Sequence, residues 1–138
     1  MKILTAFKII AVSSLVTLAS CSSTQDYSGT YSGDLISVIS MTGSPDQTIA
    51  TAVTYDVFQS DGTYYLADGS TSSNSVGFPL EGSGSSYSYT VSDPNLSSDF
   101  TMFLEFSADD LTINYSIEDI QQGTTITVSV SGVLDKVE

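Results

Sequence analysis

The chain has 138 residues, with 16 acidic residues against three lysines and a formal net charge of −13, and it contains no histidine, tryptophan or arginine. Without histidine there is no Ser-His-Asp or Cys-His nucleophile and no imidazole acid or base. Without arginine there is no bidentate clamp for a carboxylate or phosphate. A chain this acidic is also repelled by nucleic acid. The composition therefore argues against an enzyme and against a nucleic-acid-binding protein.

The first 20 residues are typical of an export signal. Lys2 and Lys8 give it a positive start, and the apolar stretch over residues 9–18 follows. That stretch is shorter than the roughly 20 residues that a membrane-spanning helix needs. We therefore expect residues 1–20 to be a signal peptide that is absent from the folded domain.

The apolar stretch ends in Leu18-Ala19-Ser20-Cys21. These residues resemble the lipobox of bacterial lipoproteins, in which an aliphatic residue and two small residues precede a cysteine. The resemblance implies cleavage before Cys21, diacylglycerol on its thiol and an acyl chain on its new amine. The alternative is an ordinary signal peptide with a chance cysteine just past its cleavage site. Cys21 is the only cysteine, so the domain would contain no disulfide and no cysteine-based metal site.

Several acyl chains hold a protein stably at a membrane, whereas one holds it only marginally. We therefore expect an exported protein, anchored to the membrane of the cell envelope through Cys21. Ser22 favours the outer membrane if the host is Gram-negative, by analogy with enteric sorting. Residues 21–26 would form a short lipidated tether, and residues 27–138 a single domain. Counted from Cys21, one lysine remains against all 16 acids, which gives a net charge of −15.

From Tyr27 onward, apolar and polar residues alternate with a period of two, which is typical of antiparallel strands with one buried and one wet face. A change of apolar phase near Leu35-Ile36 predicts a β-bulge in the first strand. Gly77 and Pro79 weaken the strand predicted to contain them. The expected strands cover residues 31–38, 48–57, 63–67, 75–80, 86–91, 100–106, 111–118 and 125–134.

About eight sequential strands, separated by turn residues such as Asp61-Gly62, predict an all-β fold, a small antiparallel up-and-down barrel. Closure of the barrel removes sheet edges that would otherwise invite aggregation. The alternative is a two-sheet β-sandwich. The 26 serines and 16 threonines suit the exposed face of such a sheet.

Three short patterns carry a resemblance to a known group of folds: YSGTYSG at residues 27–33, SADDLTI at 107–113 and SVSGVLDK at 129–136. Together they resemble the small lipocalin-like (calycin-like) barrels of bacterial lipoproteins, which tend to open with Gly-x-Tyr/Trp-x-Gly and to end with Gly-x-Leu-x-Lys. The tryptophan often seen near the start of lipocalins is missing. The resemblance implies a barrel and ligand binding, and it brings no catalytic residues.

Tyrosines are the first candidates for a binding site. Tyr55, Tyr87, Tyr89 and Tyr115 fall on the apolar phase of their strands, so in a closed sheet they would point inward. Tyrosine can line a ligand pocket, because it offers ring area and one hydroxyl. The alternative is that these rings fill the core. In the adjacent pair Tyr64-Tyr65, one ring must face outward.

A metal site is the second candidate. Asp93, Asn95 and Asp99 lie in one loop and carry the oxygen ligands that Ca²⁺ prefers. The loop lacks the residue order of an EF-hand, and a turn that Asp93-Pro94 initiates also explains these residues. Asp109-Asp110 similarly indicates a solvated turn. We therefore expect no metal and no cofactor, with this loop as a weak calcium candidate.

These observations leave three hypotheses for function, none of them catalytic. The first is a membrane-anchored module that binds a small apolar or amphipathic ligand. The second is an acidic interaction or inhibitor protein, whose negative field would speed the capture of a cationic partner protein. The third is a structural envelope lipoprotein with a packed core.

Overall fold

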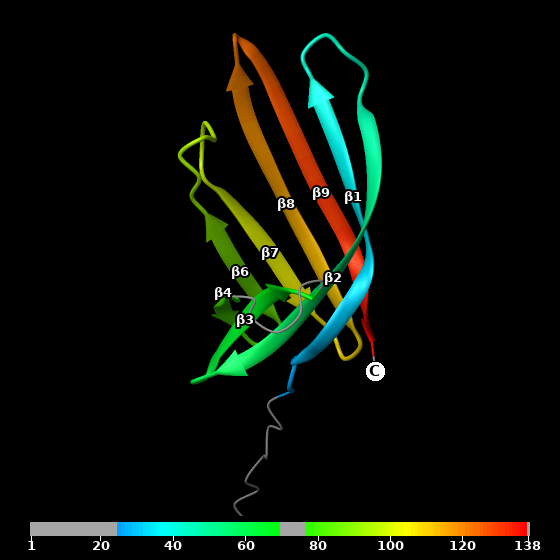
Figure 1. Cartoon of the computed structure of the whole chain (residues 1–138), viewed down its shortest axis with the longest axis vertical. Helices are drawn as coiled ribbons and strands as arrows, with labels where there is room; N and C mark the ends of the chain where they lie inside the picture. The colour runs from blue at the N-terminus through cyan, green and yellow to red at the C-terminus, as the bar shows by residue number, and fades with distance from the viewer. Residues whose placement is uncertain (1–24, 70–76, 138) are drawn as a thin grey trace, which may run out of the picture.

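The computed structural model describes residues 25–69 and 77–137 (Figure 1). The predicted signal peptide and Cys21 lie outside the described residues. Within them the structure is all β, and no helix long and apolar enough to cross a membrane occurs there. The strands are β1 (Gly29–Met41), β2 (Gln47–Ser60), β3 (Thr63–Asp68), β4 (Phe78–Pro79), β5 (Glu81–Ser83), β6 (Ser86–Val91), β7 (Phe100–Phe106), β8 (Asp110–Gln121) and β9 (Thr124–Val137).

All nine strands belong to one antiparallel sheet, in the order β4-β3-β2-β1-β9-β8-β7-β6-β5. The two strands at the ends of this order, β4 and β5, are neighbours in the chain with only Leu80 between them. Phe78 and Pro79 pair with β3, whereas β5 pairs with β6. One extended segment therefore joins both edges of the sheet. The result is a nearly closed up-and-down barrel, as the sequence predicts, and the alternative of a two-sheet sandwich is wrong.

Tight hairpins set the register of the barrel. Asp61 and Gly62 connect β2 to β3 with φ angles of 50° and 79°. Gln122 and Gly123 connect β8 to β9 with φ angles of 51° and 80°. Two central residues with positive φ are the mark of a type I′ turn, whose twist matches that of the strands it joins. The Asp-Gly turn was predicted from the sequence.

The β-bulge predicted near Leu35-Ile36 is wrong. The pairing of β1 with β2 runs without interruption from Gly29 opposite Val57 to Ile39 opposite Gln47. Ile36 simply lies on the outer face, where its side chain is 38% exposed. The change of apolar phase therefore reflects an apolar residue facing water rather than an extra residue in the strand.

The wall of the barrel is tall on one side and low on the other (Figure 1). β1, β2, β8 and β9 reach far above β3, β4 and β5. The register shows the consequence, because β2 pairs with β3 only from Tyr55 to Ser60, and β6 pairs with β5 only from Ser86 to Ser88. Among the described residues, the upper part of β2 and the upper part of β6 thus each have a strand partner on one side only.

The lower half of the barrel holds most of the buried apolar side chains. Leu104, Leu111, Ile113 and Leu134 are each at most 2% exposed. These side chains adjoin an aromatic group that we call the base cluster, which consists of Tyr27, Tyr31, Tyr64, Tyr87 and Phe106. Its rings contact one another at centroid distances of 4.9 to 6.4 Å. Such contacts add to the burial of apolar area.

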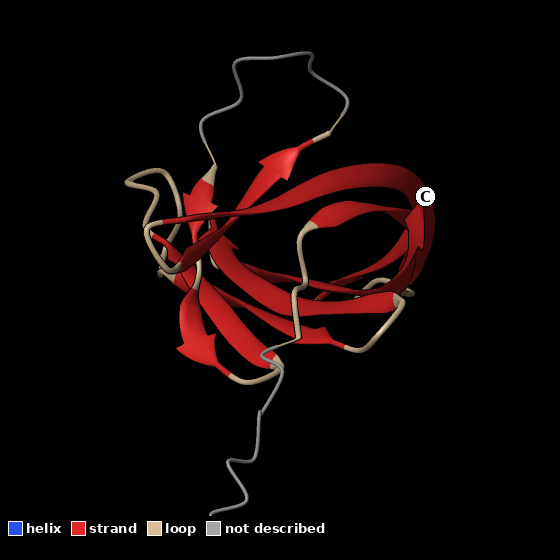
Figure 2. Ribbon diagram, turned by 90° about the horizontal axis from the view of Figure 1, so that it is seen from below, coloured by secondary structure: helices blue, strands red, loops and turns tan. Residues whose placement is uncertain are grey.

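The segment that leads into β1 crosses the lower end of the barrel, as Figure 2 shows from below. There the ring of Tyr27 stacks on Phe106 at 4.9 Å. The Tyr31 hydroxyl donates a hydrogen bond to the Tyr27 carbonyl (2.8 Å), and the Tyr27 amide donates to the Tyr64 hydroxyl (3.2 Å). Tyr27 therefore closes the base of the barrel.

Candidate ligand-binding site

A second aromatic layer lies above this lower half. We call it the collar, and it consists of Tyr55, Phe78, Tyr89, Phe100 and Tyr115. Phe78 of β4 packs against Tyr89 of β6 at 5.0 Å, and Phe100 of β7 packs against Tyr115 of β8 at 5.5 Å. Tyr55 of β2 packs against the core, as do Tyr89 and Tyr115. The collar differs from the base cluster in exposure, because Phe78 is 50% exposed whereas Tyr31 is fully buried.

An inner hollow of about 180 Å³ lies against one side of the collar. Its volume is small beside the roughly 300–1,000 Å³ of pockets for drug-sized ligands. Apolar side chains and rings make up nearly all of its lining, and Asp68 is the only charged residue among the described residues that line it. The lining consists of Tyr55, Leu66, Ala67, Asp68, Phe78, Tyr89, Val91 and Met102.

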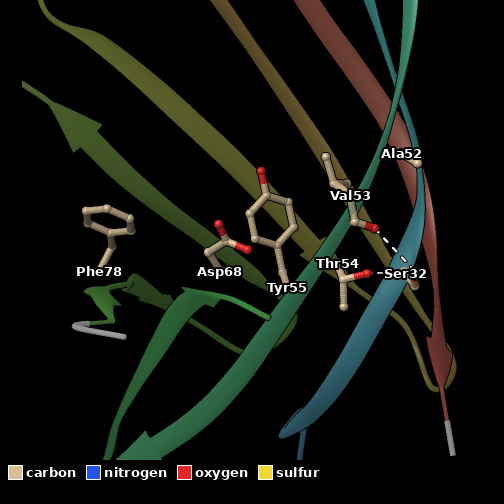
Figure 3. Close-up of a pocket in the computed structure, with 7 residues that line it drawn as sticks. All are labelled: Ser32, Ala52, Val53, Thr54, Tyr55, Asp68 and Phe78. Carbon is tan, nitrogen blue, oxygen red and sulfur yellow. Dashed lines mark hydrogen bonds between the residues drawn. The ribbon is translucent and has the colours of Figure 1, made fainter. Parts of the chain in front are cut away.

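An outer hollow of about 490 Å³ adjoins the inner one and is open to solvent. The two share Tyr55, Asp68 and Phe78. Figure 3 shows these side chains beside β2. The outer hollow extends over the upper part of β2 to Ala52 and Thr54, where β3 no longer covers that strand. The low wall therefore gives the inner hollow a lateral entrance.

Asp68 faces the inside of the barrel at this entrance. It is the register partner of Tyr55, and directly opposed residues of an antiparallel pair place their side chains on the same face, about 5 Å apart. Figure 3 shows its carboxylate beside the ring of Tyr55. Asp68 is exposed to solvent, so a carboxylate stands at the junction of the two hollows.

Burial raises the pKa of the Tyr55 hydroxyl, and the nearby Tyr115 and Asp68 raise it further. Burial likewise raises the pKa of Tyr115. The hydroxyls of Tyr55 and Tyr115 are therefore neutral near pH 7, where they act as hydrogen-bond donors and acceptors rather than as charges.

The structure separates the four tyrosines predicted from the sequence. Tyr55 and Tyr89 line the inner hollow. Tyr115 lies in the collar against Phe100. Tyr87 belongs to the base cluster, where its ring meets Tyr64 and Phe106 edge-on. All four point inward, and two of them border the candidate site.

The pair Tyr64-Tyr65 divides between the two faces of the sheet, as predicted. Tyr64 is 7% exposed and lies in the base cluster. Tyr65 stacks on Phe58 at 5.3 Å with the rings nearly parallel. Both residues of this stack belong to the outer face, because Phe58 and Tyr65 are register partners one position away from the inward pair of Val57 and Leu66.

The loop that carries the calcium candidates forms a turn. The Asp93 carboxylate accepts hydrogen bonds at 2.8 Å from the amide and from the side chain of Asn95, and the Asp93 carbonyl accepts one from Leu96. Asp99 lies at the far end of the same loop. Among the described residues, no three carboxylates come together in a group that could hold a metal ion.

Among the lining residues that sequence reasoning missed are Asp68 and Phe78, which supply the charge and an exposed ring of the site. Asp68 falls one position past the predicted end of its strand, yet it continues the inward alternation of Tyr64 and Leu66. Extending that alternation by one step would have placed it inside the barrel. Phe78 was expected in a weak strand, and nothing in the sequence indicates that it lies beside Tyr89.

Comparison of the chain with protein-family models, with curated proteins and with solved structures finds no match.

Proposed function

We propose that this protein is an exported, lipid-anchored module that binds a small apolar or amphipathic ligand in the upper half of its barrel. The observation that carries the proposal is the inner hollow, which has an almost wholly apolar lining and a lateral entrance. Binding sites for small molecules are typically concave, largely apolar and supplied with a few polar groups. The collar hydroxyls and Asp68 are such groups.

Orientation at the membrane follows from the proposed anchor. Cys21 lies four positions before Gln25, and an extended chain spans at most about 3.5 Å per position, so the anchor would lie within roughly 14 Å of Gln25. Gln25 adjoins the base cluster through its carbonyl, which accepts a hydrogen bond from Tyr64 at 3.4 Å. The closed base would therefore face the membrane. The upper end of the barrel, which we call its mouth, would face away from it.

Octanol is a suitable probe, because it is apolar, uncharged and small enough for the inner hollow. The side chain of Met102 lines this hollow, so the NMR signal of a ¹³C-labelled Met102 methyl group reports what enters it. We expect titration with octanol to shift this signal in a saturable way. Absence of any shift at the solubility limit of octanol would overturn the proposal and favour the structural lipoprotein with a packed core.

Two tryptophan variants locate the binding site. Val91→Trp places a large side chain in the inner hollow and should abolish the shift. Val133→Trp adds the same side chain on the outer face of β9, where Val133 is 56% exposed, and should leave the shift unchanged. Equal octanol binding by both variants would show that the ligand enters elsewhere. Thermal unfolding of each variant checks that it is folded.

A further inference from the structure

The carboxylate of Asp68 marks the point where an apolar space meets solvent. It is the one charged group among the described residues that line either hollow. A ligand whose apolar part fills the inner hollow must therefore present its other end to this carboxylate. The charge of that end decides whether the contact is attractive.

Aromatic rings stand beside the carboxylate. Tyr55 lies opposite Asp68 in the register, and the rings of Phe78 and Tyr89, which both line the inner hollow, contact each other at a centroid distance of 5.0 Å. The face of an aromatic ring attracts a cation within about 6 Å of its centroid. Rings and a carboxylate together form a suitable environment for a positively charged group and an unfavourable one for an anion.

The surrounding charges have the same sign. Asp56 lies on the outer face of β2 and accepts a hydrogen bond from Thr30 at 2.7 Å. A Cβ built on Gly69, the residue after Asp68, would lie 3.2 Å from the Asp56 carboxylate. A second carboxylate therefore lies near the entrance, on the opposite face of the sheet from Asp68.

The one lysine among the described residues lines neither hollow. Lys136 is register partner to Tyr31, and its ammonium group lies 5.7 Å from the centroid of that ring, in the base of the barrel. An anionic head group would find no cation in the described lining of either hollow, and it would approach a strongly acidic protein against repulsion.

We infer that the ligand is a cationic amphiphile, with its positive group between Asp68, Tyr55 and Phe78 and its apolar chain in the inner hollow. This inference rests on the proposed function and assigns its ligand class. Octyltrimethylammonium, octanol and octyl sulfate carry the same chain with a positive, neutral or negative head group. We expect the three to bind in that order of decreasing affinity, each measured by the shift of the Met102 methyl signal.

A matched pair of variants isolates the role of Asp68. Asp68→Asn and Asp61→Asn change the net charge by the same amount, and Asp61 lies in the β2–β3 turn at the opposite end of the strand. Because a partly exposed ion contact is modest, we expect Asp68→Asn to weaken octyltrimethylammonium binding roughly threefold to tenfold. Asp61→Asn should change it less than about twofold, and octanol binding should be the same in both variants.

The outcomes separate this inference from the proposal beneath it. Octyl sulfate binding as tightly as octyltrimethylammonium, or equal effects of the two asparagine variants, would overturn the cationic assignment while octanol binding still supported the hollow as a site. If none of the three probes shifts the Met102 methyl signal, both the proposed binding function and the cationic ligand class are wrong. Phe78→Leu gives a second measurement, because loss of the ring should weaken the cationic probe more than octanol.

Discussion

The long strands β1, β2, β8 and β9 run through both the base and the mouth of the barrel with one alternation, yet the two regions differ in what the inner face contacts. On β2, Val57 is 2% exposed, whereas Ile49, on the same inner face eight positions earlier, is 48% exposed. Near Val57, strands surround the interior and Tyr27 closes it from below. Near Ile49, β3 has ended, and the described residues supply no strand on that side of β2. A period of two therefore determines which face a residue occupies, but the opposing wall determines whether it is buried.

The largest difference between the two regions should appear when a leucine or isoleucine is truncated. Leu134 is fully buried in the lower half, so Leu134→Ala should lower the free energy of unfolding by about 2–5 kcal/mol through lost burial and a cavity. Ile49→Ala, on the same inner face near the mouth, should cost less than about 1 kcal/mol. Urea unfolding measures both. Equal losses would mean that the mouth is as well packed as the base.

Two glycines of β9 and its hairpin, Gly132 and Gly123, allow the same comparison between a crowded and an open position. A Cβ at Gly132 would lie 2.5 Å from the Asp34 carbonyl and 2.8 Å from a Leu35 methyl group. We therefore expect Gly132→Ala to lower the free energy of unfolding by about 1–3 kcal/mol, because the added methyl group overpacks the interior.

Gly123, in the upper hairpin, has open space around it and a φ of 80°. Gly123→Ala should cost only about 1 kcal/mol, from the strained backbone alone. Thermal unfolding of the pair tests the difference, and a larger loss from Gly123→Ala would contradict it.

High pH should lower the free energy of unfolding through Tyr31, a buried residue of the base cluster. Burial raises the pKa of Tyr31 to about 12 from an ordinary value of 10.0. Between these values the folded protein keeps a proton that the unfolded chain has lost, so the free energy of unfolding falls as pH rises, by at most about 1.4 kcal/mol per pH unit.

Tyr31→Phe tests this cause. The variant loses the hydrogen bond to the Tyr27 carbonyl and should be about 1 kcal/mol less stable at pH 8. Between pH 10 and 12, however, its stability should decline less steeply than that of the unsubstituted protein, because one buried group no longer titrates. Urea unfolding at pH 8, 10 and 11 gives the slopes. Identical slopes would show that Tyr31 is not the group responsible.

The sequence predicts the local features of this fold well. Alternation identified the long strands, and Asp61-Gly62 identified a turn, because both signals depend on neighbours in the chain. The order of the strands also followed, since consecutive antiparallel strands tend to pair. The bulge at Leu35-Ile36 was wrong because an exposed apolar residue such as Ile36 mimics a change of phase.

Features that depend on distant segments were not predictable. The site exists because β3 and β4 are short while β2 is long, and the height of a wall is not encoded in the alternation of any one strand. Asp68 became part of the site through its register with Tyr55. Tyr27 was expected to open the domain, but its place against Phe106, some 80 residues later, follows only from closure of the barrel.

The position of β1 between two long partners has a mechanical consequence. β1 pairs with β2 from Gly29 to Ile39 and with β9 from Thr30 to Met41. A force applied through an anchor at Cys21 would pull β1 along its own axis, so both ladders would have to shear together rather than open one bond at a time. Tyr27 would also have to leave the base before β1 could slide. A barrel tethered in this way would resist unfolding by a force on its anchored end, and that force would not act directly on the mouth.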